Sequence, residues 1–263
     1  MSSNLLLKNF DNNYHKNKFV VITGASGGLG LKISKLFNKL GANLILVDKI
    51  NVKKITPINK NTIHYFKTDF TSQIQIDELI KNLNVKYKKI DILINNAAYT
   101  GSDNNWIKKF GEQKIEDWHN VFKVSYEATF CLSQGISNKL KKSNGRVINI
   151  GSIFGTSIPN TKNYKGTKMG SPAAYAISKN ALLHLTKWLA VNMAPNVNVN
   201  MISPGGIKRN QPSSFIKKYN YKVPLNKMCS EEDILGAIIF LSSNLSNYVT
   251  GHNLIVDGGY SVI

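Results

Sequence analysis

A short run of β-branched residues leads directly into a glycine-rich turn and then into a helical pattern. Residues 19–23 (FVVIT) predict a buried strand, and residues 29–40 predict a helix that Gly41 ends. Between them lies TGASGGLG (23–30), whose glycines let the backbone turn tightly and approach a ligand closely. A strand–turn–helix unit of this kind is typical of a dinucleotide site, with the diphosphate on the helix N-terminus. A plain turn without a ligand is the simpler alternative.

Strand and helix patterns alternate along the rest of the chain. Further strands are predicted at 44–47, 62–67, 90–94, 146–150, 197–202 and 253–256, and helices at 71–84, 115–141, 173–193 and 231–241. Ser230 and Asp233 have the spacing of a capping box at the start of the last helix. Short apolar strands that alternate with helices indicate a parallel sheet covered on both faces. We therefore predict a single α/β domain over residues 1–263, a Rossmann-type doubly wound sheet of about seven strands.

The strong positive charge raises the question of a nucleic-acid partner. The formal net charge is +19, yet arginine occurs only at Arg146 and Arg209, and the lysines are spread along the whole chain. Nucleic-acid surfaces favour arginine, because its guanidinium contacts phosphates and guanine in two places at once. We therefore favour solvated lysines on helix faces over a nucleic-acid surface.

Metal sites, membrane spans and export signals are not indicated by the sequence. Cys131 and Cys229 are far apart, and the five histidines form no paired ligand motif. No apolar run is long enough to span a membrane, and the leucines at 5–7 are too few for an export signal. We expect no metal, no membrane association and a cytoplasmic location.

Asp48 ends the second predicted strand, a little over twenty residues after the first glycine of the turn. A carboxylate there can accept hydrogen bonds from the adenosine ribose hydroxyls and would repel a 2′-phosphate. The sequence therefore favours NAD over NADP, although Lys49 could soften that preference.

The order and spacing of eight segments resemble the short-chain dehydrogenase/reductase family over essentially the full length. They are TGASGGLG (23–30), Asp48, Asp69-Phe70, NNAA (95–98), INIGS (148–152), YAISK (175–179), SPGGI (203–207) and VTGHNLIVDGG (249–259). The resemblance implies an oxidoreductase that interconverts an alcohol and a carbonyl by hydride transfer with NAD(H). It also implies a homotetramer or homodimer, which the last of these segments would help to build.

The resemblance assigns a role to residues at each of these segments. Asp69 and Phe70 would flank the adenine, 96–98 would line the ribose and nicotinamide side, and 204–207 would contact the carboxamide. The full cofactor-binding set would be Gly24, Ser26, Gly28, Leu29, Gly30, Asp48, Asp69, Phe70, Asn96, Ala97, Ala98, Tyr175, Lys179, Pro204, Gly205 and Ile207.

Tyr175 and Lys179 are the expected acid/base pair. A free tyrosine has a pKa of about 10, too high for proton transfer near neutral pH. A lysine four residues later on the same helix face can bring its ammonium close enough to stabilise the phenolate. Ser152 would hydrogen-bond the reacting oxygen and hold it against the phenol.

Two other pairs have the same Tyr-x-x-x-Lys spacing. The pair at 14/18 precedes the glycine-rich turn and is dismissed, whereas Tyr164 with Lys168 lies closer to the family's usual distance from the serine. Glycines at 166 and 170 argue against a helix there, whereas residues 173–190 have a good helical pattern. We therefore favour Tyr175 and infer an insertion of about ten residues near 161–171.

One position departs from the family pattern. The family usually has an asparagine seven residues after the tryptophan of the long helix, where it helps to hold a proton-relay water. Counting from Trp118, that position is Ser125, whose shorter hydroxyl offers fewer hydrogen bonds. Either the relay is intact or proton exchange is altered.

Basic residues are concentrated where the family carries its substrate lid, at 206–228. This segment has six, against about three for an even spread: Lys208, Arg209, Lys217, Lys218, Lys222 and Lys227. The inferred insertion adds Lys162, Lys165 and Lys168. We hypothesise an anionic substrate, such as a phosphorylated or nucleotide-linked sugar or a carboxylate. A lysine-rich composition alone explains the pattern equally well.

Segments 203–207 and 209–212 (RNQP), together with the insertion, resemble bacterial dehydrogenases of surface-sugar or flagellin-modification pathways. A 3-oxoacyl-thioester reductase is the main enzymatic alternative, although Asp48 argues against its usual NADPH. A catalytically silent NAD-binding regulatory protein is the alternative from another class, and Ser125 is its single support.

Overall fold

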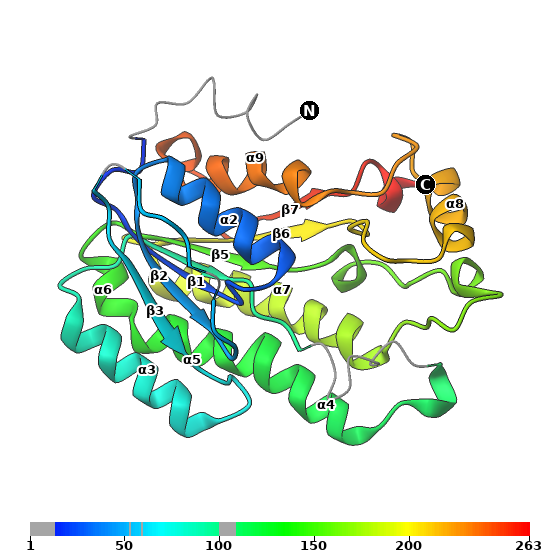
Figure 1. Cartoon of the computed structure of the whole chain (residues 1–263), viewed down its shortest axis with the longest axis horizontal. Helices are drawn as coiled ribbons and strands as arrows, with labels where there is room; N and C mark the ends of the chain where they lie inside the picture. Colours follow the sequence, from blue (N-terminus) through cyan, green and yellow to red (C-terminus); the bar gives the residue numbers. More distant parts are fainter. Residues whose placement is uncertain (1–13, 53, 59, 100–108) are drawn as a thin grey trace.

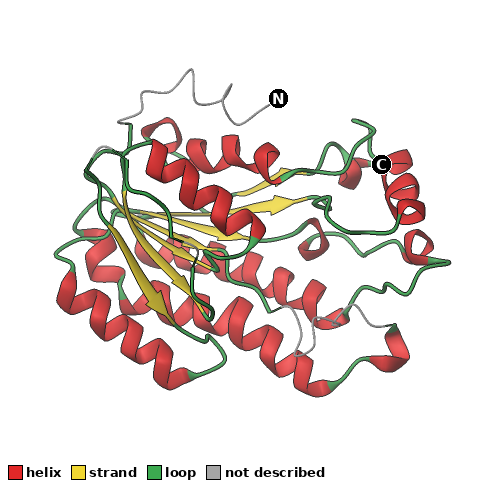
Figure 2. Cartoon of the chain, viewed as in Figure 1, coloured by secondary structure: helices red, strands yellow, loops and turns green. Residues whose placement is uncertain are grey.

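A parallel sheet of seven strands lies at the centre of the protein (Figure 1, Figure 2). The structure is a computed structural model of the chain and describes residues 14–52, 54–58, 60–99 and 109–263; the leucines at 5–7 lie outside these residues. The strands are β1 (Phe19–Thr23), β2 (Asn43–Asp48), β3 (Ile63–Lys67), β4 (Ile92–Asn95), β5 (Arg146–Ile150), β6 (Asn198–Pro204) and β7 (Asn253–Val256). They are ordered β3-β2-β1-β4-β5-β6-β7, so the direction of winding reverses between β1 and β4.

Helices cover both faces of the sheet, as the alternating pattern predicts. On one face α2 (Gly28–Lys39) and α9 (Glu231–Leu241) pack together; on the other lie α3 (Gln73–Lys86), α4 (Ile115–Phe122), α5 (Ala128–Gly135), α6 (Ser137–Lys141) and α7 (Ala173–Met193) (Figure 1). Successive side chains of a strand point to opposite faces of the sheet, so each strand contributes to both hydrophobic cores. Val20 and Ile22 pack in the core under α2 and α9, whereas Val21 packs in the core on the opposite face. The prediction of a doubly wound Rossmann-type sheet is confirmed.

The long helix predicted over 115–141 is wrong as a single element. It is divided into α4, a π-helical turn η2 (Lys123–Glu127), α5 and α6, with a break at Ile136. The helix continues through the π-helical turn, after which the Thr129 hydroxyl donates to the Ser125 carbonyl oxygen at 3.2 Å, a contact of the kind that bends helices. At the break at Ile136, the Asn84 side chain donates to the carbonyl oxygen of Gly135 at 2.8 Å. The Gly135 carbonyl oxygen is therefore hydrogen-bonded to a side chain of α3, and the Lys139 N–H of the next helical turn bonds to Ile136 instead.

Sequence patterns also missed the helix α8 (Ser213–Lys222), which lies within the 206–228 segment. Short 3-10 turns complete the described structure: η1 (Phe110–Glu112), η3 (Ile153–Gly155), η4 (Thr161–Tyr164), η5 (Asn244–Ser246) and η6 (Tyr260–Val262). The capping box of α9 forms as predicted, with Ser230 and Asp233 bonding each other's backbone N–H groups. Within the described ranges, no helix has the length and apolar character needed to cross a bilayer.

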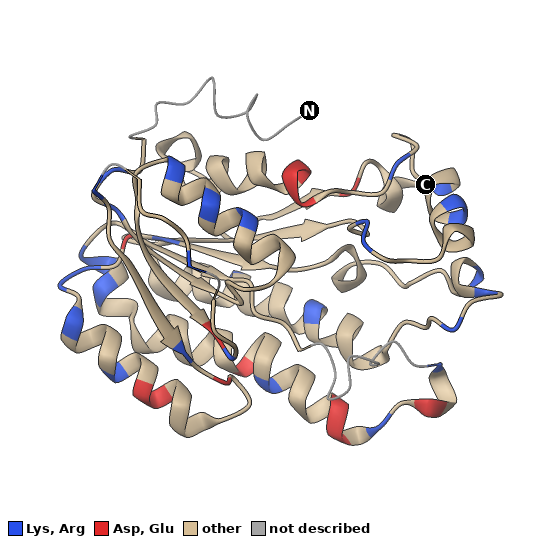
Figure 3. Cartoon of the chain, in the orientation of Figure 1, with Lys and Arg blue, Asp and Glu red and all other residues tan. Residues whose placement is uncertain are grey.

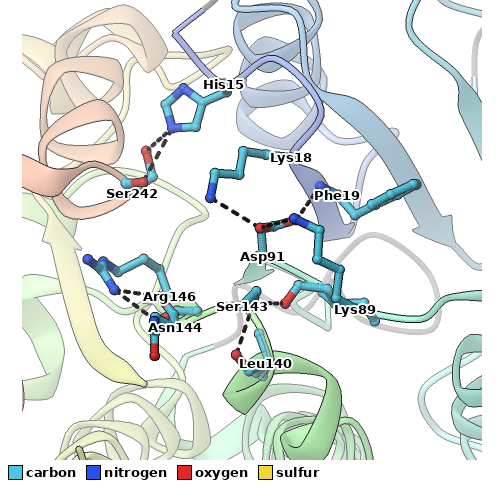
Figure 4. Close-up of polar contacts among 12 residues, drawn as sticks. His15, Lys18, Phe19, Lys89, Asp91, Leu140, Ser143, Asn144, Arg146 and Ser242 are labelled. Carbon is cyan, nitrogen blue, oxygen red and sulfur yellow. Dashed lines mark hydrogen bonds and ion pairs between the residues drawn. The ribbon is translucent and has the colours of Figure 1, made fainter. Parts of the chain in front are cut away.

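Polar contacts close the sheet where β1, β4 and β5 begin (Figure 4). The buried Asp91 carboxylate accepts hydrogen bonds from the Phe19 N–H at 2.9 Å and from the ammonium groups of Lys18 and Lys89. Ser143 donates its hydroxyl to carbonyl oxygens of the neighbouring backbone. The segments predicted to bind the dinucleotide lie at the opposite end of the sheet, where the parallel strands finish.

Candidate active site

The segments predicted to bind a dinucleotide meet at the carboxyl end of the sheet. The glycine-rich turn follows β1, Asp48 ends β2, 96–98 follow β4, Ser152 follows β5 and 205–207 follow β6. Since all seven strands are parallel, these ends share one edge, and ligands of open α/β sheets bind at such an edge near the reversal of strand order.

The glycine-rich turn is built too closely for side chains. Gly24 has φ +64°, and a Cβ on Gly30 would lie 2.0 Å from the Gly24 carbonyl oxygen. The N-cap of α2 is Gly27, which supplies no capping side chain, and the first turn has no acidic residue. The Ser26 hydroxyl is buried without a hydrogen-bond partner among the described residues. A tight cradle at a helix N-terminus without a side-chain cap fits a dinucleotide diphosphate.

The Asp48 carboxylate lies directly beside this turn. It accepts the Ser26 N–H at 2.8 Å and the Ile50 N–H at 3.3 Å. These bonds fix the carboxylate at the end of β2, where the sequence places the ribose contact. Further acceptor positions on its two oxygens are available for hydroxyl groups.

Asn96 holds the turn in place from the end of β4. Its side-chain amide donates to the carbonyl oxygens of Thr23 and Gly24, each at 3.0 Å. In return the Thr23 hydroxyl accepts the backbone N–H groups of Asn96 and Ala97. The Asn96 amide thus shapes the cradle, a role that sequence reasoning did not assign to it.

The remaining predicted cofactor residues lie at both sides of this cradle. Asp69 accepts hydrogen bonds from the N–H and hydroxyl of Thr71, and Phe70 is buried in the core after β3. After β6, the Gly205 N–H donates to the Val256 carbonyl oxygen, and Ile207 pairs with Cys229. Backbone hydrogen bonds thus hold the predicted contact segment after β6, and the Asp69 side chain holds the turn after β3.

Ser152, Tyr175 and Lys179 converge next to the cradle. The hydroxyls of Ser152 and Tyr175 are hydrogen-bonded to each other. The Lys179 ammonium lies 5.7 Å from the centre of the Tyr175 ring and donates to the Ile150 carbonyl oxygen at 2.8 Å. One helix face brings the two α7 side chains together, since they are four residues apart. α7 also packs against η3, which follows Ser152 directly.

Burial dominates the electrostatics of this cluster. It raises the pKa of Tyr175, while the hydrogen bond from Ser152 and the positive charge of Arg209 act in the opposite direction. Burial also lowers the pKa of Lys179 to about 8. The Lys179 ammonium, which the sequence prediction named as the cation beside the phenol, is bonded to the Ile150 carbonyl oxygen, and the positive charge of Arg209 also lowers the pKa of Tyr175, a contribution that the sequence did not predict.

Ser125 is buried in the π-helical turn η2, which packs against α7. Its carbonyl oxygen accepts the Thr129 hydroxyl. The predicted relay residue therefore lies on an element in contact with the helix of the acid/base pair.

The other two Tyr-x-x-x-Lys pairs lie in different surroundings. Tyr164 packs on Phe215 of α8 with ring centres 5.4 Å apart, hydrogen-bonds Ser171, and has its pKa raised to about 12 by burial. Tyr14 contacts His15, whose N–H donates to the Leu40 carbonyl oxygen beyond the far end of α2. Of the three tyrosines, Tyr175 is the one that lies against Ser152.

An aromatic contact joins α8, the inferred insertion and the last turn of the chain. The Tyr219 hydroxyl of α8 accepts the Gly206 N–H at 2.6 Å, and its ring stacks on Tyr260 at 4.7 Å. Asn163, from the inferred insertion, donates to the Tyr260 hydroxyl at 3.1 Å. Sequence reasoning missed this contact, because its partners are up to about a hundred residues apart.

Comparison with known proteins identifies the family. Residues 24–261 match the family model described as enoyl-(acyl carrier protein) reductase. A crystal structure of a short-chain dehydrogenase from Leptospira borgpetersenii, with bound NAD+, is 36% identical, covers 95% of each chain and has a TM-score of 0.86. The chain belongs to the short-chain dehydrogenase/reductase family. The resemblance inferred from the sequence is confirmed.

Two curated relatives of this short-chain dehydrogenase/reductase carry different names. A 3-oxoacyl-(acyl-carrier-protein) reductase of Buchnera aphidicola is 34% identical, over 92% of this chain and 96% of its own length. The post-translational flagellin modification protein A of Campylobacter coli is 32% identical, over 94% and 99%. Membership of the family makes the protein an oxidoreductase, and the two names correspond to the substrate alternatives weighed above.

Proposed function

We propose that this oxidoreductase interconverts an alcohol and a carbonyl with NAD(H), with Tyr175 as the acid/base. The observation that carries the proposal is the hydrogen bond between Ser152 and Tyr175, with Lys179 buried on the same helix face. Ser152 follows β5 at the same edge of the sheet as the glycine-rich turn, so a substrate oxygen at the phenol would lie close to a bound dinucleotide.

The cradle and Asp48 fit NAD. The orphaned Ser26 hydroxyl, the uncapped first turn of α2 and the close glycine contacts suit a diphosphate, and the Asp48 carboxylate suits ribose hydroxyls. The Leptospira relative was solved with NAD+. When bound, the nicotinamide supplies the hydride acceptor or donor. The other predicted contacts, at 69–70, 96–98 and 204–207, would hold the adenine and nicotinamide ends.

The residues of the cluster share the proton chemistry. In the oxidation direction the Tyr175 phenolate takes the proton of the substrate alcohol, and in the reverse direction the Tyr175 hydroxyl returns that proton to the carbonyl oxygen. Ser152 donates a hydrogen bond to that oxygen and keeps it against the phenol. Lys179, with its pKa lowered to about 8, supplies positive charge near neutral pH and holds the end of β5 through the Ile150 carbonyl. Ser125 would connect the cluster to water through η2.

Substitution of the phenol tests this assignment. We expect Tyr175→Phe to retain folding and NADH binding but to lose at least about a thousandfold in turnover. Tyr164→Phe is the matched control, because Tyr164 is also a buried tyrosine followed by a lysine four residues later. Loss of turnover in the control, with an active Tyr175→Phe, would contradict the proposal. NADH absorbance with a panel of sugars, hydroxy acids and 3-oxoacyl thioesters is the assay.

For the substrate we propose an anionic sugar derivative. Figure 3 shows Lys and Arg gathered over α8 and the tip of the inferred insertion. Within this group the Lys218 ammonium donates to the Lys165 carbonyl oxygen at 2.6 Å, so the two segments form one basic surface. The flagellin-modification relative supports a sugar, whereas the Buchnera relative supports a 3-oxoacyl thioester. A KM that is independent of salt and of Lys217→Gln would exclude the anionic substrate.

We further propose a homotetramer or homodimer formed through α5 and α7. A hollow of about 560 Å³ lies between these helices and is lined largely by apolar side chains, including Phe130 and Trp188. Trp188 is 47% exposed and borders this apolar hollow, and an exposed apolar patch of this kind often marks an interaction site. Light scattering should give a mass above that of one chain for the native protein and a smaller mass for Trp188→Glu.

A further inference from the structure

A pair of opposite charges lies directly on the glycine-rich turn. The Arg209 Nε lies 3.4 Å from the Glu231 Oε1, and the two residues come from the 206–228 segment and the first turn of α9. A Cβ built on Gly28 would lie 2.8 Å from the same Glu231 oxygen and 3.3 Å from the Arg209 Nη2. Both charged groups therefore rest against the first residue of α2.

The ion pair is open to solvent on its Arg209 side. The Arg209 side chain is 56% exposed and Glu231 18%, so solvent screens the guanidinium and weakens its pairing with the carboxylate. The N-terminus of α9 is capped by Ser230 and Asp233, so Glu231 is not its cap. A neighbouring pair, Lys32 with Glu232, already joins α2 to α9.

Arg209 also acts on the acid/base. The positive charge of Arg209 lowers the pKa of Tyr175, against the effect of burial. The guanidinium is therefore close enough to act on both the phenol and the glycine-rich turn. A guanidinium beside uncapped helix N–H groups presents planar, paired donors to a phosphate. A carboxylate in the same place repels one.

We propose that Arg209 binds the diphosphate of the dinucleotide and that Glu231 holds this guanidinium until the diphosphate displaces it. The inference rests on the proposed NAD(H) function. In the exchange the ion pair of Arg209 with one carboxylate is replaced by an ion pair with a doubly charged diphosphate. The N-terminus of α2, which has no side-chain cap, adds a further favourable interaction with that anion. Glu231 therefore competes with the cofactor and lowers its affinity.

Binding measurements separate the two charges. By titration calorimetry, we expect Arg209→Gln to weaken NADH and ADP-ribose about tenfold, because a charge-assisted hydrogen bond to phosphate is lost. Adenosine, which has no diphosphate, should bind both proteins equally. Glu231→Gln should tighten NADH and ADP-ribose about threefold, because the competing carboxylate is gone.

Two neighbours provide matched controls. Lys208→Gln removes a positive charge from the same segment, and Glu232→Gln removes a negative charge from the same helical turn. Each should leave the Kd of ADP-ribose within about twofold. Thermal melting should show that all four variants fold.

The outcomes distinguish this inference from the function on which it rests. A native protein that binds neither NADH nor ADP-ribose would overturn both. Native binding with an unchanged Kd in Arg209→Gln, or an equal loss for adenosine, would overturn the role of Arg209 while leaving the proposed function intact. Weaker binding by Glu231→Gln would show that the carboxylate positions Arg209 rather than competes with the diphosphate.

Discussion

His15 is a buried imidazole that should make the fold sensitive to mild acid. The side chain is 2% exposed, and its Nε2 lies 3.3 Å from the carbonyl oxygen and 3.2 Å from the hydroxyl of Ser242 (Figure 4). Its Nδ1 has no hydrogen-bond partner in the described structure, and its ring packs edge-on against Phe37. Burial lowers the pKa of His15 to about 4.

The direction and size of the effect follow from this pKa. An unfolded histidine titrates near pH 6.5, so between that pH and about pH 4 the unfolded chain binds a proton that folded His15 does not. The stability from this group is therefore present at neutral pH and declines as the pH falls. Linkage gives a loss of about 2 kcal/mol between pH 7 and pH 5.

Urea unfolding of wild type and His15→Gln at these two pH values measures the effect. The variant should be less stable at pH 7 by about 1–3 kcal/mol, because packing around the ring is lost. Its stability should then fall by about 2 kcal/mol less than that of the wild type on going to pH 5. The exposed His119→Gln is the matched control for losing one imidazole. Equal losses in wild type and His15→Gln would refute the argument.

Four further predictions concern the site. Gly30→Ala should abolish NADH binding in fluorescence titrations and lower Tm by several degrees, because its methyl would lie 2.0 Å from the Gly24 carbonyl oxygen. Asp48→Asn should raise the NADPH-to-NADH ratio of kcat/KM at least about tenfold, since the charge that repels a 2′-phosphate is removed. In Lys179→Met the pH–rate profile should lose the inflection near pH 8, with turnover lower by at least about a hundredfold. Ser125→Asn tests the proton relay: a severalfold rise in turnover would show that the native relay is impaired, and unchanged turnover would show that it is intact. Steady-state rates in water and in deuterium oxide report whether proton transfer limits turnover in each protein.

The sheet was predictable because each of its strands is marked locally. Strands such as 44–47 and 146–150 are short apolar runs bounded by turn residues, and their order along the chain implies the parallel topology. The choice of Tyr175 over Tyr164 rested on helical pattern, and the contact with Ser152 agrees with that choice. The sequence predicts a structural feature well where the residues of a single segment determine that feature.

Features that depend on two distant segments were missed. The break at Ile136 depends on Asn84 of another helix, and the Arg209–Glu231 pair depends on α9 lying beside the glycine-rich turn. The effect of burial on the Tyr175 pKa also required the folded surroundings. No spacing in a single sequence encodes such contacts, because they depend on how the helices pack on the sheet.

The Tyr219–Tyr260 stack has a kinetic consequence. The Tyr219 ring of α8 stacks on Tyr260 of the last turn, and Asn163 of the inferred insertion donates to the Tyr260 hydroxyl, so an outward movement of α8 alone would break the stack. We expect substrate entry past α8 to separate the rings, so the stack should slow the exchange of substrate and product. A residue near the carboxyl terminus is thereby expected to influence the rate of a reaction whose proposed acid/base lies on α7.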